Sequence, residues 1–353
     1  MDKDLRCSDV RVTIIVPCYN MGEKIHRMLD SLLSQSIHCF KIFVIDDGSK
    51  DNSREVVKSY KEKFSSIGVE LNYIFQSNGG VSEAVNNGLK RVDTDFFCLP
   101  DADDFLAPTY MQEFMDYFDR HEDCGIVFSM CNVFHVSDRK NPVGVLQRKD
   151  EFKQDGESLC KDFIWGTNVY YCPDYMIRTK DFVRANGSLE IENGRYGQNY
   201  QMLLPMVYHS KCGYINKPLY NYIIYRQSIS HGKRTLQQHY ASFDGGTKSL
   251  HETIKKMNLP SETENSFHKI VDQKNAIQKA DKACEYGNKK LFEQFYQEIA
   301  EEFLSSSFKK IYDKRNTFLF FYLVTKYKRT RTAIRNSTLI YKIKILKNLV
   351  RNK

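Results

Sequence analysis

The chain has 353 residues, of which 41% are hydrophobic and 13% aromatic. This length suffices for two domains, and the composition excludes an intrinsically disordered chain. No apolar run is long enough to span a bilayer and no apolar core follows Met1, so we expect neither a membrane-spanning helix nor a signal peptide. The 10 cysteines contain no CxxC pair, which excludes the usual zinc spacing and fits free thiols in a reducing cytoplasm.

The net charge of +8 is distributed unevenly along the chain. Residues 309–353 contain 14 Lys or Arg and one acid, Asp313, a net charge of +13, so residues 1–308 carry −5. A strongly basic segment favours a polyanionic partner, which is either a membrane surface or a nucleic acid.

Short β-branched runs alternate with amphipathic helical segments through the first part of the chain. Such alternation with short links is typical of parallel βαβ units. We therefore predict an α/β fold with a doubly wound, mostly parallel sheet of the Rossmann-like kind. The predicted strands are 12–17, 41–45, 71–75, 96–99 and 125–134, and the predicted helices are 22–35, 52–64, 82–91 and 109–118.

The later part of the chain shows two changes in its pattern of polar and apolar residues. Residues 135–160 are polar and predict a loop, whereas residues 165–225 are aromatic and are expected to complete the first domain and line a substrate cleft. Beyond residue 239 the pattern is helical and polar. The predicted parts are a first domain over 1–235, a helical extension over 236–308 and a basic amphipathic tail over 309–353.

Aspartates close two of the predicted strands. Asp46 and Asp47 follow one strand, and Asp101, Asp103 and Asp104 follow another. The carboxyl ends of strands are where open α/β sheets bind ligands, and carboxylates so close together repel one another unless a cation neutralises them. Mg²⁺ or Mn²⁺ suits such hard oxygen ligands and usually brings a phosphate-bearing substrate. A surface turn rich in Asp is the alternative for a single such motif.

Four short motifs stand near the ends of the predicted strands. They are Val16-Pro17-Cys18-Tyr19-Asn20, Asp46-Asp47-Gly48-Ser49, Asn78-Gly79-Gly80-Val81-Ser82 and Asp101-Ala102-Asp103-Asp104. In this order and spacing they closely resemble the nucleotide-sugar-binding half of the inverting family 2 glycosyltransferases, which have the type A fold. The resemblance covers residues 12–110, roughly the first third of the chain.

The resemblance implies a nucleotide-sugar site at the carboxyl edge of the sheet. Tyr19 would stack on the base beside Pro17, and Asp47 would accept hydrogen bonds from the base with Asp46 next to it. The glycine pair at 79–80 would let the backbone approach the ligand or make a tight turn. The residues assigned to the nucleotide sugar are Pro17, Tyr19, Asn20, Asp46, Asp47, Gly79, Gly80 and Asp103.

The same resemblance implies a divalent metal, Mn²⁺ or Mg²⁺, held by Asp101, Asp103 and Asp104. The ion would bridge the diphosphate and stabilise charge on the departing nucleotide. Many members of the family carry an Arg where this chain has Val85, so one fewer cation faces the diphosphate. We expect Arg226, in a later loop, to supply that cation.

The catalytic base departs from the family pattern. Where the family usually has a Gly-Glu-Asp-like motif, this chain has the amides Gln198 and Asn199. An amide cannot take a proton from an acceptor hydroxyl, although it can bind sugar hydroxyls. Glu190, Glu192 or Asp174 is therefore expected to supply the base.

These features predict an enzyme, a metal-dependent glycosyltransferase of the hexosyltransferase type. It would move a sugar from a nucleotide diphosphate sugar, a UDP-sugar by resemblance, to an acceptor hydroxyl with inversion. One alternative is a non-catalytic scaffold that binds a sugar nucleotide or a glycan, and another is an adaptor built around the basic tail. A nucleotidyltransferase also has acidic strand ends, but residues 19–24 lack its glycine-rich basic loop.

The basic tail admits two interpretations. Its apolar stretch 318–324 and the later Ile, Leu and Lys pattern favour a helix lying on an anionic membrane; alternatively, the apolar face packs on protein. No nucleic-acid-binding module accompanies the charge, so we expect no nucleic-acid partner. A membrane-associated enzyme at the cytoplasmic face would suit a lipid-linked acceptor in the biosynthesis of a surface polysaccharide such as a capsule.

Overall fold

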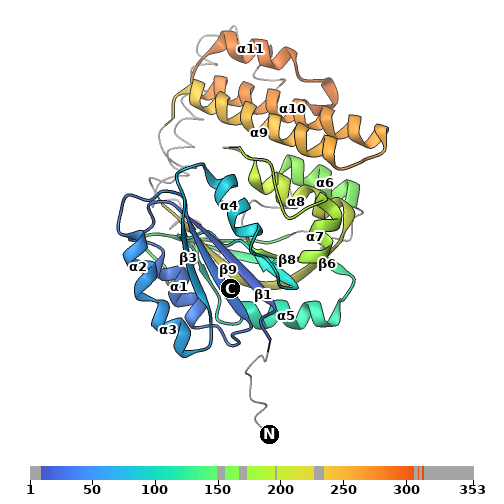
Figure 1. The fold of residues 1–353 in the computed structure, drawn as a ribbon. Coiled ribbons are helices and arrows are strands. Elements are labelled where there is room, and N and C mark those ends of the chain that lie inside the picture. The colour runs from blue at the N-terminus through green and yellow to red at the C-terminus, as the bar shows by residue number, and fades with distance from the viewer. Residues whose placement is uncertain are drawn as a thin grey trace, which may run out of the picture. The chain divides into compact units, whose positions relative to one another are not determined.

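Figure 1 shows the fold in a computed structural model of the chain. The structure describes residues 9–148, 156–166, 173–194, 197–225, 234–305, 309 and 312–313. The chain forms two compact units, Met1–Ile223 and Ile224–Lys353. Arg226 and nearly all of the basic tail lie outside the described residues, so the predictions made for them stay predictions, as do the predicted domain boundaries.

The first half of the sheet is parallel, as predicted. Strand β1 (Val12–Cys18) pairs in parallel with β2 (Phe40–Asp46) and with β4 (Phe96–Cys98), and β2 pairs in parallel with β3 (Leu71–Phe75). Val, Ile and Phe side chains cover both faces of β1 and β2, which explains their nearly continuous burial. The strand ends that carry the predicted site residues therefore meet at one edge of the sheet.

In the second half of the sheet the strand pairs described here are antiparallel. Strand β8 (Tyr175–Arg178) runs antiparallel to β4, and β6 (Cys124–His135) runs antiparallel to β8, so β6 points the same way as β4. Strand β5 (Phe105–Leu106) pairs with the long β9 (Lys211–Ile224). Within the described residues the order is β3-β2-β1-β4-β8-β6-β9-β5, which confirms the predicted fold class.

The predicted loop over 135–160 is wrong in part. Strand β7 (Gly144–Leu146) pairs with β6, and helix α6 (Gly156–Trp165) begins inside the same stretch. A strand of three residues is too short to show a hydrophobic period, which explains why the pattern did not reveal it.

Helices cover the sheet of the first unit. The predicted helix over 52–64 is two helices that meet at Tyr60, and two further helices, over 179–186 and 198–209, lie in the aromatic stretch 165–225, where no clear period was visible. The helices of the first unit are α1 (His26–Leu33), α2 (Ser53–Ser59), α3 (Lys61–Ser66), α4 (Val81–Leu89), α5 (Tyr110–Arg120), α6, α7 (Thr179–Asn186) and α8 (Gln198–His209).

Helix α4 approaches the sheet unusually closely because of one glycine. A Cβ atom built on Gly88 would lie 2.3 Å from Cγ2 of Ile15 in β1. Only a residue without a side chain fits this contact. The N-terminus of α4 is thereby held next to the carboxyl ends of β1 and β2, where the site residues lie.

The second unit is helical, as predicted. It contains α9 (Leu236–Lys256), α10 (Ser261–Glu285) and α11 (Lys289–Gln297), followed by a short turn of 3₁₀-helix. Thr235 and Gln238 form a reciprocal capping box at the start of α9. None of the helices in the described part of the chain combines the length and the apolar character that crossing a bilayer requires.

Candidate active site

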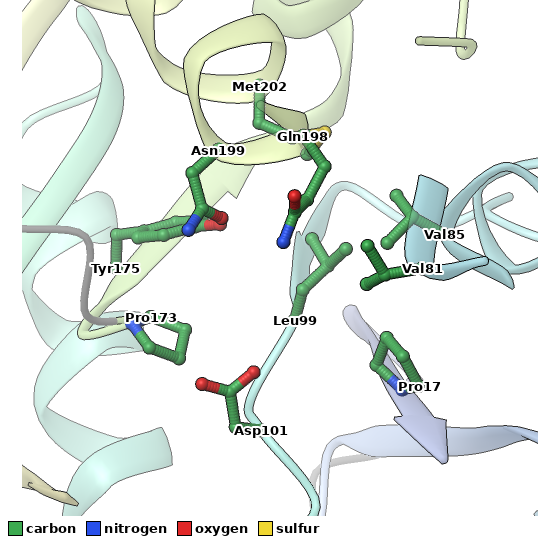
Figure 2. A pocket seen from close by; sticks show the side chains of 10 residues that line it. All are labelled: Pro17, Val81, Val85, Leu99, Asp101, Pro173, Tyr175, Gln198, Asn199 and Met202. Atoms are coloured by element: carbon green, nitrogen blue, oxygen red, sulfur yellow. The ribbon is translucent and has the colours of Figure 1, made fainter. Parts of the chain in front are cut away.

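A pocket opens at the carboxyl edge of the sheet in the first unit (Figure 2). Its walls are mainly apolar, and Asp101 reaches in from the turn after β4 while the amides of α8 face it from the other side. The stretch 165–225 contributes one wall, as expected. The lining residues are Pro17, Val81, Val85, Leu99, Asp101, Pro173, Tyr175, Gln198, Asn199 and Met202.

Asp47 holds the loop that opens helix α4. Its buried carboxylate accepts hydrogen bonds from the backbone N–H groups of Gly79 and Gly80, both at 2.9 Å, and from the side chain of Gln76 at 2.8 Å. Gly80 has φ of +94°, a backbone conformation that disfavours other residues. The glycine pair therefore serves a tight turn, and the predicted contact between Asp47 and a base stays a prediction.

Both carboxylate oxygens of Asp46 also accept hydrogen bonds from the protein. One carboxylate oxygen accepts the backbone N–H of Ser49 at 2.7 Å, and the other accepts the hydroxyl of Tyr73. Burial, followed by this hydrogen bond, raises the pKa of Tyr73 above its ordinary range, so the phenol remains the donor. The hydrogen bond from Ser49 to Asp46 thus holds the turn that follows β2 and contains Asp47.

The end of β1 joins the same turn. The backbone N–H of Asn20 donates to Ser49 Oγ at 2.8 Å, and the Asn20 side chain accepts the N–H of Lys50 at 2.9 Å. Tyr19 is 46% exposed, and Pro17 lines the pocket. The structure therefore leaves the Tyr19 ring available for stacking, whereas the Asn20 side chain is used in holding the two loops together.

The three acidic residues after β4 have different surroundings. Asp104 is fully buried, and its two oxygens accept the Tyr220 hydroxyl at 2.9 Å and the backbone N–H of Ile223 at 2.8 Å. Asp103 is partly buried and lies 3.7 Å from the ammonium group of Lys24. Asp101 lines the pocket.

Burial, and then the neighbouring carboxylates, disfavour the charged forms of Asp101 and Asp104. Burial, and then the charges of Asp101 and Asp103, raise the pKa of Asp104 well above its usual value, against the two hydrogen bonds that it accepts. The protein packed around Asp101 and the charge of Asp103 raise the pKa of Asp101 to about 7, although its side chain keeps an exposed surface. Repulsion of this kind is relieved when a cation binds.

No cluster of three or more His, Cys, Asp or Glu side chains is arranged as a metal site among the residues that the structure describes. Asp101 and Asp103 nevertheless fit a Mg²⁺ or Mn²⁺ ion, because such ions commonly use one or two carboxylates together with substrate phosphates. Asp104 fits less well, since both of its oxygens already accept hydrogen bonds.

The residues considered for the catalytic base lie in three different settings. Gln198 and Asn199 line the pocket from the start of α8. Glu190 is exposed and lies 3.3 Å from Lys90. Glu192 is partly buried, and its backbone N–H donates to the side chain of Gln201 at 2.5 Å.

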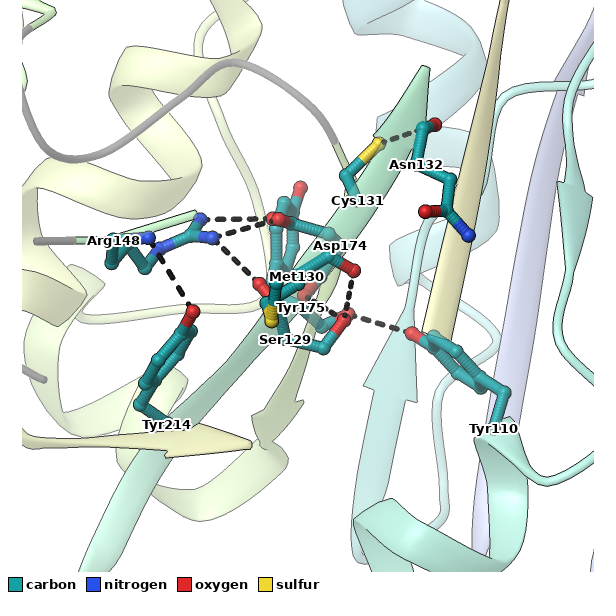
Figure 3. A network of polar contacts seen from close by, with 9 residues as sticks. All are labelled: Tyr110, Ser129, Met130, Cys131, Asn132, Arg148, Asp174, Tyr175 and Tyr214. Carbon is teal, nitrogen blue, oxygen red and sulfur yellow. Dashed lines mark hydrogen bonds and ion pairs between the residues drawn. The ribbon is translucent and has the colours of Figure 1, made fainter. Parts of the chain in front are cut away.

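Asp174 is excluded as a base, contrary to one of the sequence-based alternatives. Figure 3 shows its carboxylate in a two-pronged ion pair with Arg148, at 2.8 and 2.9 Å. Both side chains have no exposed surface, and Arg148 also donates to the carbonyl of Ser129 at 2.7 Å. Burial raises the pKa of Asp174, against the effect of Arg148. No acceptor hydroxyl can reach a carboxylate in this position.

Two residues that donate hydrogen bonds to the aspartates after β2 were not identified from the sequence. Gln76 and Tyr73 hold Asp47 and Asp46, and they lie on β3 or directly after it. Open α/β sheets bind ligands at the carboxyl ends of their strands. When this rule is applied to the predicted strand over 71–75, it points to Gln76, which follows that strand. Tyr175 and Met202 were not predictable in the same way, because they belong to elements without a clear hydrophobic period.

Comparison with known proteins shows which family this chain is similar to. Residues 13–185 match the model of glycosyl transferase family 2. Glycosyltransferase GlyA of Streptococcus pneumoniae serotype 4 is 27% identical over 240 residues, which is 63% of this chain and 32% of GlyA. The chain thus spans about a third of that relative.

Solved structures share the fold. Staphylococcus aureus TarS 1–349 in complex with UDP-GlcNAc aligns with a TM-score of 0.59 and 16% identity over 91% of this chain and 90% of TarS 1–349. The mannosyltransferase PcManGT from Pyrobaculum calidifontis, in complex with GDP-Man and Mn²⁺, aligns with a TM-score of 0.53 and 13% identity over 94% of this chain and 88% of PcManGT. Residues 13–185, just under half of the chain, are thus similar to glycosyl transferase family 2, and the two solved structures share the fold of the chain.

Proposed function

We propose that the protein is a glycosyltransferase that moves a sugar from a nucleotide diphosphate sugar to an acceptor hydroxyl with inversion. The observation that carries the proposal is the pocket of the family 2 domain, where Asp101 faces the amides Gln198 and Asn199 across apolar walls. A carboxylate opposite two amides can hold a cation with a diphosphate on one side and sugar hydroxyls on the other.

A UDP-sugar is the donor that we favour. The exposed ring of Tyr19 offers a face to a base, and Asp47 lies at the end of the neighbouring strand. TarS, which shares the fold, is solved with UDP-GlcNAc, whereas PcManGT is solved with GDP-Man. The donor panel described below distinguishes these nucleotides.

Asp101 and Asp103 would hold a divalent metal against the diphosphate, and Asp104 would keep the turn in place through its bonds to β9. When bound, the ion neutralises charge on the leaving nucleotide. Lys24 is close to Asp103 and would be displaced from it, or would share it, when a metal enters. The Mn²⁺ in the PcManGT complex supports a metal in this fold.

Glu192 is the residue that we favour as the general base. It lies six residues before Gln198, partly buried, on the segment that leads toward α8. As the acceptor oxygen bonds to the anomeric carbon, the carboxylate takes the hydroxyl proton and the bond to phosphate breaks, so that nucleotide diphosphate departs. Attack from the face opposite the leaving group inverts the anomeric configuration. Exposed Glu190, held toward Lys90, is the second choice.

The acceptor that we favour is a lipid-linked surface polysaccharide at the cytoplasmic face of a membrane. The support is the charge of residues 309–353, which suits an anionic bilayer. A scaffold that binds a sugar nucleotide without turnover is the second candidate, favoured by the amides that stand where the family usually has an acid.

The test is hydrolysis of a panel of UDP- and GDP-sugars with Mn²⁺ and no acceptor, measured as release of the nucleotide diphosphate. We expect slow, metal-dependent release from one donor. Asp103→Asn should lose most of this release and the metal-dependent part of nucleotide affinity, because one hard oxygen charge is removed. Asp123→Asn, at an exposed ion pair with Lys211, is the matched control.

Two results would contradict the proposal. Unchanged metal-dependent affinity in Asp103→Asn would show that the metal lies elsewhere. Tight binding of UDP or GDP with no release from any donor, with or without added glycan acceptors, would favour the non-catalytic scaffold.

A further inference from the structure

A buried side-chain amide joins helix α4 to the segment that carries Glu192. The oxygen of Asn86 accepts the backbone N–H of Ile191 at 2.8 Å, and its nitrogen donates to the Ile191 carbonyl at 2.7 Å. The same nitrogen donates to the side chain of Asn193 at 2.9 Å. Asn86 is only 8% exposed. Both donors of this amide are therefore used on one short segment more than 100 residues away in sequence.

A second buried amide holds the same segment from the opposite side. The side-chain oxygen of Gln201, in α8, accepts the backbone N–H of Glu192 at 2.5 Å. Gln201 is 7% exposed. The peptide group that precedes the Glu192 Cα atom is thus held at both of its polar atoms, by Asn86 at the Ile191 carbonyl and by Gln201 at the Glu192 N–H.

Both amides belong to helices that form the walls of the pocket. Val85, the neighbour of Asn86, and Gln198, one helical turn before Gln201, line the pocket (Figure 2). Helix α4 is in turn fixed on β1 by the close contact of Gly88 with Ile15. The position of Glu192 is therefore tied to the pocket walls and not left to a free loop.

We propose that Asn86 and Gln201 are positioning residues that set the place of the Glu192 carboxylate for the proton transfer. The inference rests on the proposed function. A general base acts only when it lies within hydrogen-bond reach of the proton that it takes, so small displacements of the segment reduce turnover. The proposed nucleotide site lies at the ends of β1 and β2, whereas the hydrogen bonds of the two amides described above go to residues 191–193, so the affinity for nucleotide should not depend on them.

A double-mutant cycle tests this inference. The probe is the donor that the panel identifies, with Mn²⁺ and water as the acceptor. Asn86→Asp keeps the shape of the side chain but replaces the donating NH₂ by a charged oxygen facing the Ile191 carbonyl. We expect kcat to fall on the order of 10- to 100-fold, with Kd for UDP unchanged. In the Glu192→Gln background the same change should alter kcat less than about twofold, because the base is already absent.

The Gln201 position supplies a second, independent comparison. Gln201→Glu keeps an oxygen acceptor for the N–H of Glu192 and is expected to retain kcat within about threefold, whereas Gln201→Leu removes the acceptor and should lower kcat on the order of tenfold. If thermal melting shows that Asn86→Asp does not fold, the comparison of Gln201→Glu with Gln201→Leu still tests the positioning role.

Four outcomes overturn the inference, and the first three can be distinguished from failure of the proposed function. Equal losses from Asn86→Asp in both backgrounds, or a large rise in Kd for UDP, would show a structural role only. Full activity of Glu192→Gln would remove Glu192 as the base. No turnover by the wild-type protein would refute the proposed function and the inference with it.

Discussion

At the scale of single residues, the pair of Arg148 and Asp174 is the clearest buried charge in the described part of the chain. The guanidinium group lies 4.6 Å from the ring centre of Phe128, and its donors reach Asp174 and the Ser129 carbonyl. A buried charge is tolerated because its partner and its hydrogen bonds replace water. The pair thereby fixes the start of β8, which leads from Pro173 into the pocket wall.

Removing one member of this pair should be costly. Arg148→Met leaves the Asp174 carboxylate buried without its partner, and we expect the free energy of unfolding to fall by about 3–5 kcal/mol, measured by denaturant titration. Arg148→Met combined with Asp174→Leu should recover most of the loss. Lys211→Met, at the exposed pair with Asp123, serves as the control and should leave the midpoint unchanged. If Arg148→Met and the control Lys211→Met unfold at the same denaturant concentration, the Arg148–Asp174 pair has no structural role.

At the scale of elements, helix α4 links the sheet, the pocket and the segment of Glu192. Val81 and Val85 face the pocket, whereas Gly88 faces Ile15 in β1. Asn86 faces Ile191. Residues of this short helix thus contact the pocket, β1 and the segment of Glu192, so its position on the sheet controls several parts of the site at once.

Two helical glycines give a matched test of this close packing. In Gly88→Ala the new Cβ would lie 2.3 Å from Ile15 Cγ2, and we expect a loss of about 1–3 kcal/mol of stability because buried Ile15 must move. Around Gly246, in α9, no atom lies within 4 Å of the new Cβ. Gly246→Ala should therefore stabilise by about 0.5–1 kcal/mol through helix propensity alone. Thermal melting of both variants is the measurement, and shifts of the same sign would refute the argument.

The parallel half of the fold was predictable, because its strands are buried on both faces and read as short apolar runs. In the antiparallel half the strand over 125–134 was predicted, whereas β7 is too short to show a period and α8 contains Pro205, which argues against a helix in a single sequence. Among site residues, sequence motifs located the acidic strand ends. They did not reveal that Asp104 is bonded to β9 or that Asp174 is paired with Arg148, because these partners are distant in sequence.

At the scale of the whole molecule, the chain combines a domain with an acidic pocket and a tail of opposite charge. Residues 1–308 carry −5 and residues 309–353 carry +13. In the proposed association with an anionic bilayer, the positive charge of residues 309–353 would supply the attraction and the negative charge of residues 1–308 would oppose it.

Deletion of residues 309–353 is expected to abolish binding to vesicles that contain anionic lipid, while leaving UDP release in solution unchanged. Cosedimentation with anionic and with neutral vesicles measures the binding. Binding of the full chain should weaken as salt rises from about 0.05 to 0.5 M, because the attraction is screened. Equal binding to neutral vesicles, or salt-independent binding, would favour an apolar contact instead.

The bonds of Asp104 to Tyr220 and Ile223 bear on the order in which the chain matures during synthesis. These partners are made 116 and 119 residues after Asp104, so a nascent chain that stops before β9 has three crowded carboxylates and nothing to satisfy the innermost one. Such a chain has already made every motif that resembles a nucleotide site. On the proposed function, the turn that carries Asp101 and Asp103 would reach its final form only after β9 has left the ribosome, so capture of a sugar nucleotide would wait until the domain is complete.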